Sequence, residues 1–114
     1  MAPEITVKDL ALKLQSQDEF VLLDVREAYE LEAASLSDRR LVTAPMSRLS
    51  REGISGLPPA ALDRQAVIYV LCHHGVRSAQ VTNWLSAQGW KNVFSVRGGI
   101  DAYAAKVDRA VGFY

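Results

Sequence analysis

The chain is poor in cysteine and has no excess charge of either sign, and each shortage excludes a class of protein. Among its 114 residues Cys72 is the only cysteine, so no disulfide can form within the chain. A free thiol suits a reducing compartment, and we expect the protein to be cytoplasmic. Its 13 basic and 13 acidic residues cancel, which leaves no general attraction for nucleic acid or for an anionic membrane surface.

Long hydrophobic runs are also missing. The longest apolar run, residues 66–72, is far shorter than the roughly 20 residues that span a bilayer. The opening residues "MAPEITVKDL" lack the basic start and apolar stretch of a secretory signal. The length and the 49% share of hydrophobic residues predict one compact domain over residues 1–114 with a modest core. A neutral chain is compatible with a monomer or a dimer.

The apolar patterning predicts helices and strands in alternation. Predicted strands cover residues 19–25, 40–45, 66–72 and 91–96, and predicted helices cover residues 7–16, 27–35, 77–89 and 98–108. Glycine and proline break residues 46–65, where we expect short helical turns. Thr6 is the expected N-cap of the first helix. Strands that are apolar on both faces and alternate with helices indicate an α/β fold with a parallel sheet.

Three polar residues fall at the predicted carboxyl ends of strands, where open α/β sheets bind their ligands: Asp24, Cys72 and Arg97. We expect Asp24 to support the site by accepting hydrogen bonds from loop amides. Arg26 is expected to pair with Glu27 or Glu30. Arg97 is expected either at the rim of the pocket or on the surface.

The segment "VLCHHGVRS" places the thiol where a buried strand turns into a helix. Only four residues separate Cys72 from Arg77, so the connection must curl tightly, and Gly75 can adopt the conformation that this requires. Inward-pointing amides and the free N–H groups of the first helical turn then form an anion-binding cradle. Such a cradle favours the thiolate, and Arg77 adds a permanent positive charge. The pattern predicts an activated nucleophile at the floor of an anion pocket.

Other interpretations of these residues are weaker. Cys72 taken alone is typical of a small buried hydrophobic residue. Zinc needs three or four ligands, and the chain offers one cysteine beside His73 and His74, so we expect no metal and no cofactor. The two histidines are expected to form the wall of the pocket mouth. The pair Gly98–Gly99 indicates a tight strand-to-helix turn rather than a phosphate loop, which would need a third glycine.

Three segments together resemble rhodanese domains. "CHHGVRS" is similar to their active-site loop, C-x-x-G-x-R, "LLDVREAYE" to their segment after the second strand, and "VRGGIDAY" to their C-terminal glycine pair and helix. The tail "KVDRAVGFY" is similar to that of rhodanese domains fused to adenylyltransferases. The resemblance covers residues 5–114 and implies a rhodanese-like fold, a five-stranded parallel sheet with helices on both faces.

The resemblance also implies sulfurtransferase activity. Cys72 would take a sulfane sulfur from a small anionic donor such as thiosulfate and hold it as a persulfide. It would then pass the sulfur to a thiol, to cyanide or to an acceptor protein. Arg77 would hold the anionic part of the donor or brace the loop. The loop amides would stabilise the terminal sulfur anion; these belong to His73, His74, Gly75, Val76, Arg77 and Ser78.

The chain departs from the family pattern in two places, and other functions stay open. The histidine-glycine-alanine segment before the third strand is replaced by "AASLSDRRLVTAPMSRL", and Tyr103 stands where a tryptophan is common. A phosphatase or arsenate reductase on the related fold is one alternative, although those loops hold five residues between cysteine and arginine. A non-catalytic interaction module with a rhodanese shape is the other, although such modules usually lack the cysteine.

Overall fold

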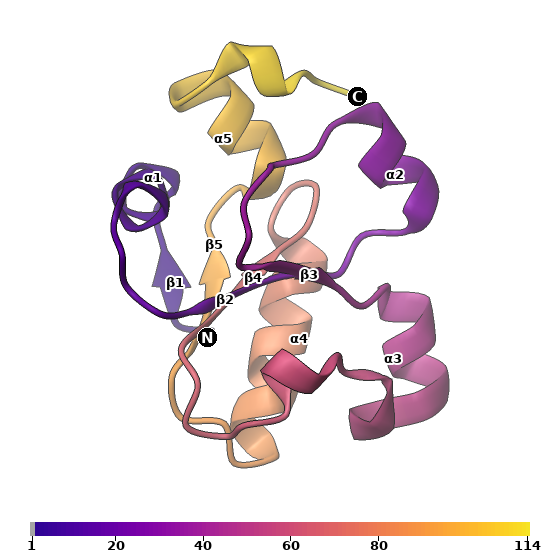
Figure 1. Cartoon of the computed structure of the whole chain (residues 1–114). Coiled ribbons are helices and arrows are strands. Elements are labelled where there is room, and N and C mark those ends of the chain that lie inside the picture. The colour runs from indigo at the N-terminus through magenta and orange to yellow at the C-terminus, as the bar shows by residue number, and fades with distance from the viewer. Residues whose placement is uncertain (1) are drawn as a thin grey trace.

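The computed structural model describes residues 2–114, which build one five-stranded sheet with helices on both of its faces (Figure 1). The strands are β1 (Glu4–Ile5), β2 (Val21–Asp24), β3 (Leu41–Thr43), β4 (Ile68–Leu71) and β5 (Val93–Val96). They lie in the order β1-β5-β4-β2-β3, and each neighbouring pair is parallel. The five-stranded parallel sheet is therefore confirmed.

Five α-helices surround the sheet. They are α1 (Val7–Gln15), α2 (Ala28–Ala33), α3 (Met46–Glu52), α4 (Val76–Ala87) and α5 (Gly99–Lys106). The hydroxyl of Thr6 accepts a hydrogen bond of 3.1 Å from the backbone N–H of Asp9, as expected of an N-cap. No helix within residues 2–114 has both the length and the apolar character needed to cross a bilayer.

The sheet separates two hydrophobic cores, which explains why its central strands are apolar on both faces. On one face, Leu23 and Val70 pack with residues of α3 and α4 and with Trp90. On the other face, Leu22 and Leu71 pack with residues of α1 and α5. Neighbouring residues of one strand point to opposite faces, so the run of apolar residues follows from burial on both sides.

Several predicted boundaries differ from the observed ones. The two-residue strand β1 was not predicted, because a stretch this short has no periodic pattern; it pairs with β5 through the register Glu4–Ser95. The predicted strands are longer than those observed, since their first residues form connections. The broken region contains α3 followed by two 3-10 helices, Gly53–Gly56 and Pro59–Ala61.

The topology brings the carboxyl ends of β2 and β4 together at one edge of the sheet. Strands β2 and β4 are neighbours, and Asp24 lies beside Leu71 in their register. Because both strands run in the same direction, the residues that follow them reach the same edge of the sheet. Cys72 and Arg26 therefore belong to one site, although 45 residues separate them in number.

Candidate active site

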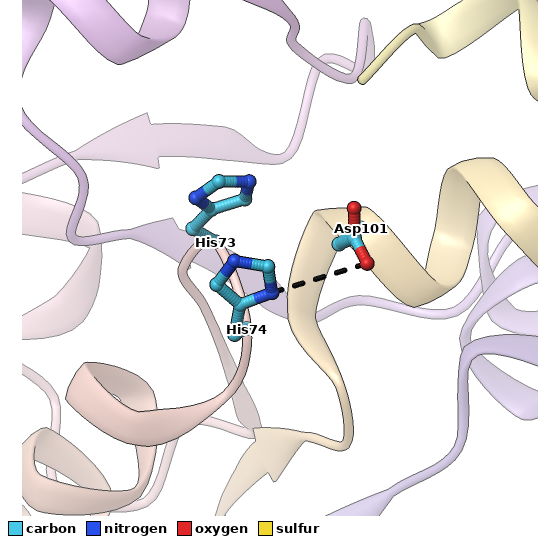
Figure 2. A group of neighbouring side chains, drawn as sticks. All are labelled: His73, His74 and Asp101. Carbon is cyan, nitrogen blue, oxygen red and sulfur yellow. Dashed lines mark ion pairs between the residues drawn. The ribbon is translucent and has the colours of Figure 1, made fainter. Parts of the chain in front are cut away.

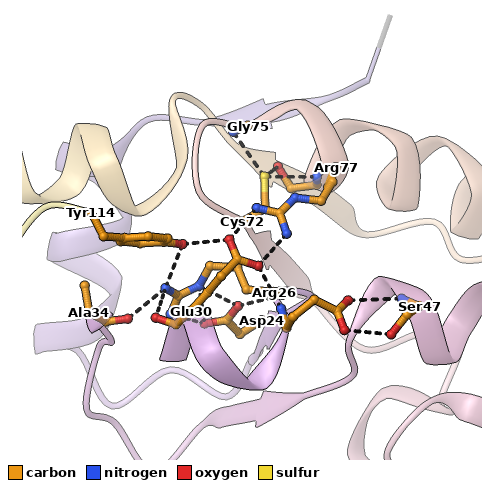
Figure 3. Close-up of polar contacts among 11 residues, drawn as sticks. Asp24, Arg26, Glu30, Ala34, Ser47, Cys72, Gly75, Arg77 and Tyr114 are labelled. Atoms are coloured by element: carbon orange, nitrogen blue, oxygen red, sulfur yellow. Dashed lines mark hydrogen bonds and ion pairs between the residues drawn. The ribbon is translucent and has the colours of Figure 1, made fainter. Parts of the chain in front are cut away.

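The thiol of Cys72 lies at the end of β4 inside a tight loop that leads into α4 (Figure 3). The backbone N–H groups of Gly75 and Ser78 donate hydrogen bonds to its Sγ, at 3.1 and 3.3 Å. Gly75 has a φ of 98°, a left-handed conformation that favours glycine. The residue is only 1% exposed, yet the surroundings of its sulfur are polar. These two amides point inward, as a cradle for a sulfur anion requires.

A pair of buried hydroxyl groups lies behind the sulfur. The Oγ of Ser78 is 3.4 Å from Sγ and 2.7 Å from the Oγ of Ser95 on β5. A serine hydroxyl can both donate and accept, so Ser78 can donate to a thiolate while it accepts from Ser95. Ser95 was not among the predicted site residues. A serine inside the otherwise apolar strand "VFSV" was the available signal.

The start of α5 fixes the cysteine loop through hydrogen bonds to its carbonyl oxygens. The N–H groups of Ile100 and Asp101 donate to the carbonyl oxygens of Cys72 and His73, at 2.9 and 3.1 Å. Gly99 makes this approach possible, because a Cβ at its position would overlap both carbonyl oxygens. The glycine pair is thus a turn, as predicted, and it is also the support on which the cysteine loop rests.

Arg77 is bound by a carboxylate that the sequence did not identify as its partner. Its Nη1 and Nη2 lie 2.6 and 2.8 Å from the two oxygens of Glu30 on α2. Glu30 is buried and also accepts hydrogen bonds from the N–H of Glu27 and the hydroxyl of Tyr114. The hydrogen bonds from Arg77 are the main reason that the pKa of Glu30 falls to about 2. Glu30 is therefore ionised at neutral pH and matches the charge of Arg77.

A second ion pair lies beneath the first and corrects one prediction. Arg26 is fully buried and pairs with Asp24, with 2.8 Å between Nη2 and Oδ2, instead of pairing with the carboxylate of Glu27 or Glu30. Arg26 also donates to the carbonyl oxygens of Glu30 and Ala34. Asp24 accepts from the side chain and the backbone N–H of Arg26, and not from the amides of the cysteine loop. Asp24 and Arg26 are two residues apart, so their side chains meet locally. The hydrogen bonds of Arg26 to Glu30 and Ala34 then fix the position of α2.

The histidines stack with the C-terminal residue. The His73 ring lies between the rings of His74 and Tyr114, with 3.8 Å between centroids on each side. Burial and the neighbouring His74 lower the pKa of His73. The Tyr114 hydroxyl donates a hydrogen bond to Glu30 and accepts one from Arg26. Tyr114 therefore contacts both the ion pairs and, through the ring of His73, the cysteine loop.

The histidines do not form a converging metal site. His73, His74 and Asp101 offer ligand atoms within 4.8 Å of one another, and Nδ1 of His74 lies 3.9 Å from Asp101 (Figure 2). The two imidazoles are stacked with an angle of 26° between their planes. A metal ion binds a ring nitrogen in the plane of the ring. With the two rings stacked in this way, an ion shared by both histidines would require at least one imidazole to rotate.

Two remaining candidates lie away from the sulfur. The side chain of Val76 is 67% exposed at the start of α4. Arg97 is exposed and pairs with Glu4 on β1, with 3.0 Å between Nε and Oε1. No hydrogen bond or ion pair found among residues 2–114 joins the side chain of Arg97 to the cysteine loop. The surface position, one of the two expected for Arg97, is the one that it occupies.

Comparison with known proteins agrees with this geometry. The family model of the rhodanese-like domain matches residues 6–106. A sulfurtransferase from Allochromatium vinosum is 33% identical over 91% of this chain and 90% of its own. The crystal structure of a rhodanese-related protein from Thermoplasma volcanium has a TM-score of 0.73 and 31% identity, covering 92% of this chain and 93% of that one.

The fold and the cysteine loop thus define a rhodanese-like α/β domain with a thiol at its centre. The chain belongs to the rhodanese-like domain family, whose sulfurtransferases are among its relatives.

Some relatives are much longer than this chain. A rhodanese-like/PpiC domain-containing protein from Arabidopsis thaliana is 38% identical over 97% of this chain, which spans 37% of that protein. Across five such relatives the chain spans between 22% and 53% of their lengths. Whatever those proteins do as a whole involves parts that have no counterpart within these 114 residues.

Proposed function

We propose that the protein is a sulfurtransferase that carries sulfane sulfur as a persulfide on Cys72. The observation that supports this most directly is the pair of amide hydrogen bonds, from Gly75 and Ser78, that converge on Sγ. Two donors at Sγ stabilise the negative charge of the attacking thiolate, and of Cys72 when it leaves as a thiolate in the second half of the transfer. The amides of the rest of the loop, residues 73–78, complete the proposed cradle.

The transfer has two balanced halves. In the first, the Cys72 thiolate attacks the outer sulfur of a donor, the donor's S–S bond breaks, and the donor's remainder leaves with the bonding electrons. In the second, a thiolate or cyanide attacks the outer sulfur of the persulfide, and Cys72 leaves as a thiolate. No external oxidant or reductant is needed, because each half exchanges one bond to sulfur for another.

The rest of the proposal concerns the surroundings of this reaction. We place the single domain over residues 1–114, without cofactor or metal, in the cytoplasm, where a free thiol persists. The partners are a sulfur donor and an acceptor, with a sulfur-accepting protein as one form of the latter. A phosphatase or arsenate reductase receives less support, because Arg77 is bound by Glu30 and only four residues separate it from Cys72.

The test is sulfur loading of the purified chain. We expect incubation with a sulfane-sulfur donor, glutathione persulfide or thiosulfate, to add one sulfur atom to the intact mass, and cyanide to remove it as thiocyanate. Cys72→Ser should abolish loading, because serine cannot form a persulfide. Release of phosphate from an aryl phosphate without any sulfur gain would overturn the proposal. So would a Cys72→Ser variant that loads like the wild type.

A further inference from the structure

The positive charges around the sulfur are already matched by carboxylates. Glu30 binds both terminal nitrogens of Arg77, at 2.6 and 2.8 Å. Asp24 accepts hydrogen bonds from Nε and Nη2 of Arg26. Figure 3 shows the two pairs side by side, with Arg77 between Glu30 and the loop of Cys72. The cradle therefore offers backbone dipoles to an anion, and both guanidinium charges of the site are already compensated.

The Glu30 carboxylate is held so firmly that Arg77 is not free to exchange it for a substrate. One oxygen accepts from Arg77 and from the N–H of Glu27, and the other accepts from Arg77 and from the Tyr114 hydroxyl. Four donors fill the acceptor sites of a carboxylate. A donor can still reach the other N–H groups of Arg77, but the positive charge that they carry is already balanced by the buried carboxylate.

This charge balance discriminates between sulfur donors. Thiosulfate is a dianion and releases sulfite, another dianion, so its reaction gains most from an uncompensated cation. The reacting S–SH group of an organic hydropersulfide, R–S–SH, carries at most one negative charge, and the R–S⁻ that it releases takes up a proton. Dipoles without a net positive charge suit the second kind of donor better than the first.

The exposed residues beside the ion pair suit an organic group. Tyr29 precedes Glu30 on α2 and is 72% exposed, and Val76 precedes Arg77 and is 67% exposed. The Glu30–Arg77 pair joins the two helices that carry these side chains. Exposed side chains of these two kinds, an aromatic ring and a branched aliphatic group, would offer apolar contacts to the R group of a hydropersulfide. The sulfite part of thiosulfate has no apolar surface to bury against these side chains.

We propose, on the basis of the sulfurtransferase function above, that Cys72 takes its sulfur from an organic hydropersulfide in preference to thiosulfate. The Cys72 thiolate attacks the outer sulfur of R–S–SH, the S–S bond of the donor breaks, and R–S⁻ leaves. The proton of the newly formed Cys72–S–SH passes to R–S⁻, which leaves Cys72–S–S⁻ in the cradle and R–SH in solution. Glu30 is a positioning residue that sets this preference by holding and neutralising Arg77.

The test compares second-order rate constants of sulfur loading, measured by intact mass, for glutathione persulfide and for thiosulfate. We expect the wild type to prefer glutathione persulfide at least tenfold. Glu30→Gln keeps the shape of the side chain and removes its charge, so it should narrow the preference about tenfold by speeding the reaction with thiosulfate. Glu32→Gln removes the same charge from an exposed position on the same helix and is the control. A cysteine desulfurase loaded with persulfide is the third donor. Its rate of loading, compared with that of glutathione persulfide, shows whether the chain takes sulfur from a protein or from a small molecule.

Tyr29→Ala keeps the proposal testable if Glu30→Gln does not fold, because Tyr29 is exposed. It should slow loading from glutathione persulfide about threefold more than loading from thiosulfate. A wild type that loads at least as fast from thiosulfate overturns this inference and leaves the sulfurtransferase function standing. A preference that Glu30→Gln does not narrow overturns the role of Glu30. Failure to load from any donor overturns the proposed function itself.

Discussion

At the scale of single residues, the site is a buried sulfur atom beside the hydrophobic core that receives hydrogen bonds from two backbone amides and lies next to one hydroxyl group. The amides of Gly75 and Ser78 are fixed by the backbone, whereas the hydroxyl of Ser78 can rotate. Ser95 accepts or donates behind it, at 2.7 Å. The Ser78 hydroxyl is therefore the one side-chain group that can follow the charge of the sulfur as it changes.

Replacing this hydroxyl tests its contribution. We expect Ser78→Ala to slow sulfur loading and alkylation by iodoacetamide at pH 7 about tenfold, since a hydrogen bond to a charged group contributes about 1.5 kcal/mol or more. The amide of residue 78 remains in the variant, so activity should fall without vanishing. Ser86→Ala on the exposed side of the same helix is the control. Equal rates for Ser78→Ala and the wild type would contradict this role.

At the scale of elements, the shape of the cysteine loop depends on two helices that approach it from different sides. The loop amides lead into α4, and the first N–H groups of α5 hold the carbonyl oxygens of Cys72 and His73. With its carbonyls engaged by α5, the loop presents its N–H groups to the sulfur. Gly99 matters because it allows α5 to come this close.

Two glycine substitutions separate backbone strain from close packing. Gly53 and Gly99 have nearly the same φ, 64° and 65°, but nothing lies within 4 Å of a Cβ at Gly53. Gly53→Ala should therefore cost mainly the strain of this backbone conformation, φ 64° and ψ −144°, about 1–3 kcal/mol. Gly99→Ala should lower the free energy of unfolding by at least about 2 kcal/mol more and slow sulfur loading, because the loop must move. Urea denaturation measures both, and equal losses would argue against a close contact at Gly99.

At the scale of the whole molecule, residues far apart in the sequence meet in one polar network. Glu30 on α2 is hydrogen-bonded to Arg77 on α4. The hydroxyl of Tyr114 is hydrogen-bonded to both Glu30 and Arg26. The network connects three segments that have no covalent link near the site. It therefore contributes to the stability of the fold as well as to the charge balance around Cys72.

This network makes the free energy of unfolding depend on pH. The pKa of Glu30 is lowered from 4.5 to about 2, first by the hydrogen bonds from Arg77. Its contribution, about 3 kcal/mol, is complete above about pH 4.5 and is lost as the pH falls toward 2, because the unfolded chain takes up the proton first. Glu30→Gln should remove this part of the pH dependence, and Glu32→Gln should keep it. Chemical denaturation between pH 2 and pH 6 measures the difference; identical slopes for Glu30→Gln and the wild type would refute it.

The sequence by itself determined the class of fold and the position of the proposed nucleophile. Runs of apolar residues predicted the four longer strands, because a strand covered on both faces needs no polar residue. The short distance from Cys72 to Arg77 and the glycine between them predicted a tight loop, because few residues leave few conformations. Such signals are local, and they can be read from neighbours in the chain.

Only the tertiary structure decided which charged groups meet. Arg77 lies 47 residues from Glu30, and Tyr114 lies 84 residues from Glu30, so no local pattern links them. The expected pairing of Arg26 was wrong, because its guanidinium pairs with the carboxylate of Asp24, two residues before it in the sequence. Strand β1 is too short to show a period and exists through its pairing with β5. Partners across elements are set by how the helices pack on the sheet, and packing is a property of the folded chain.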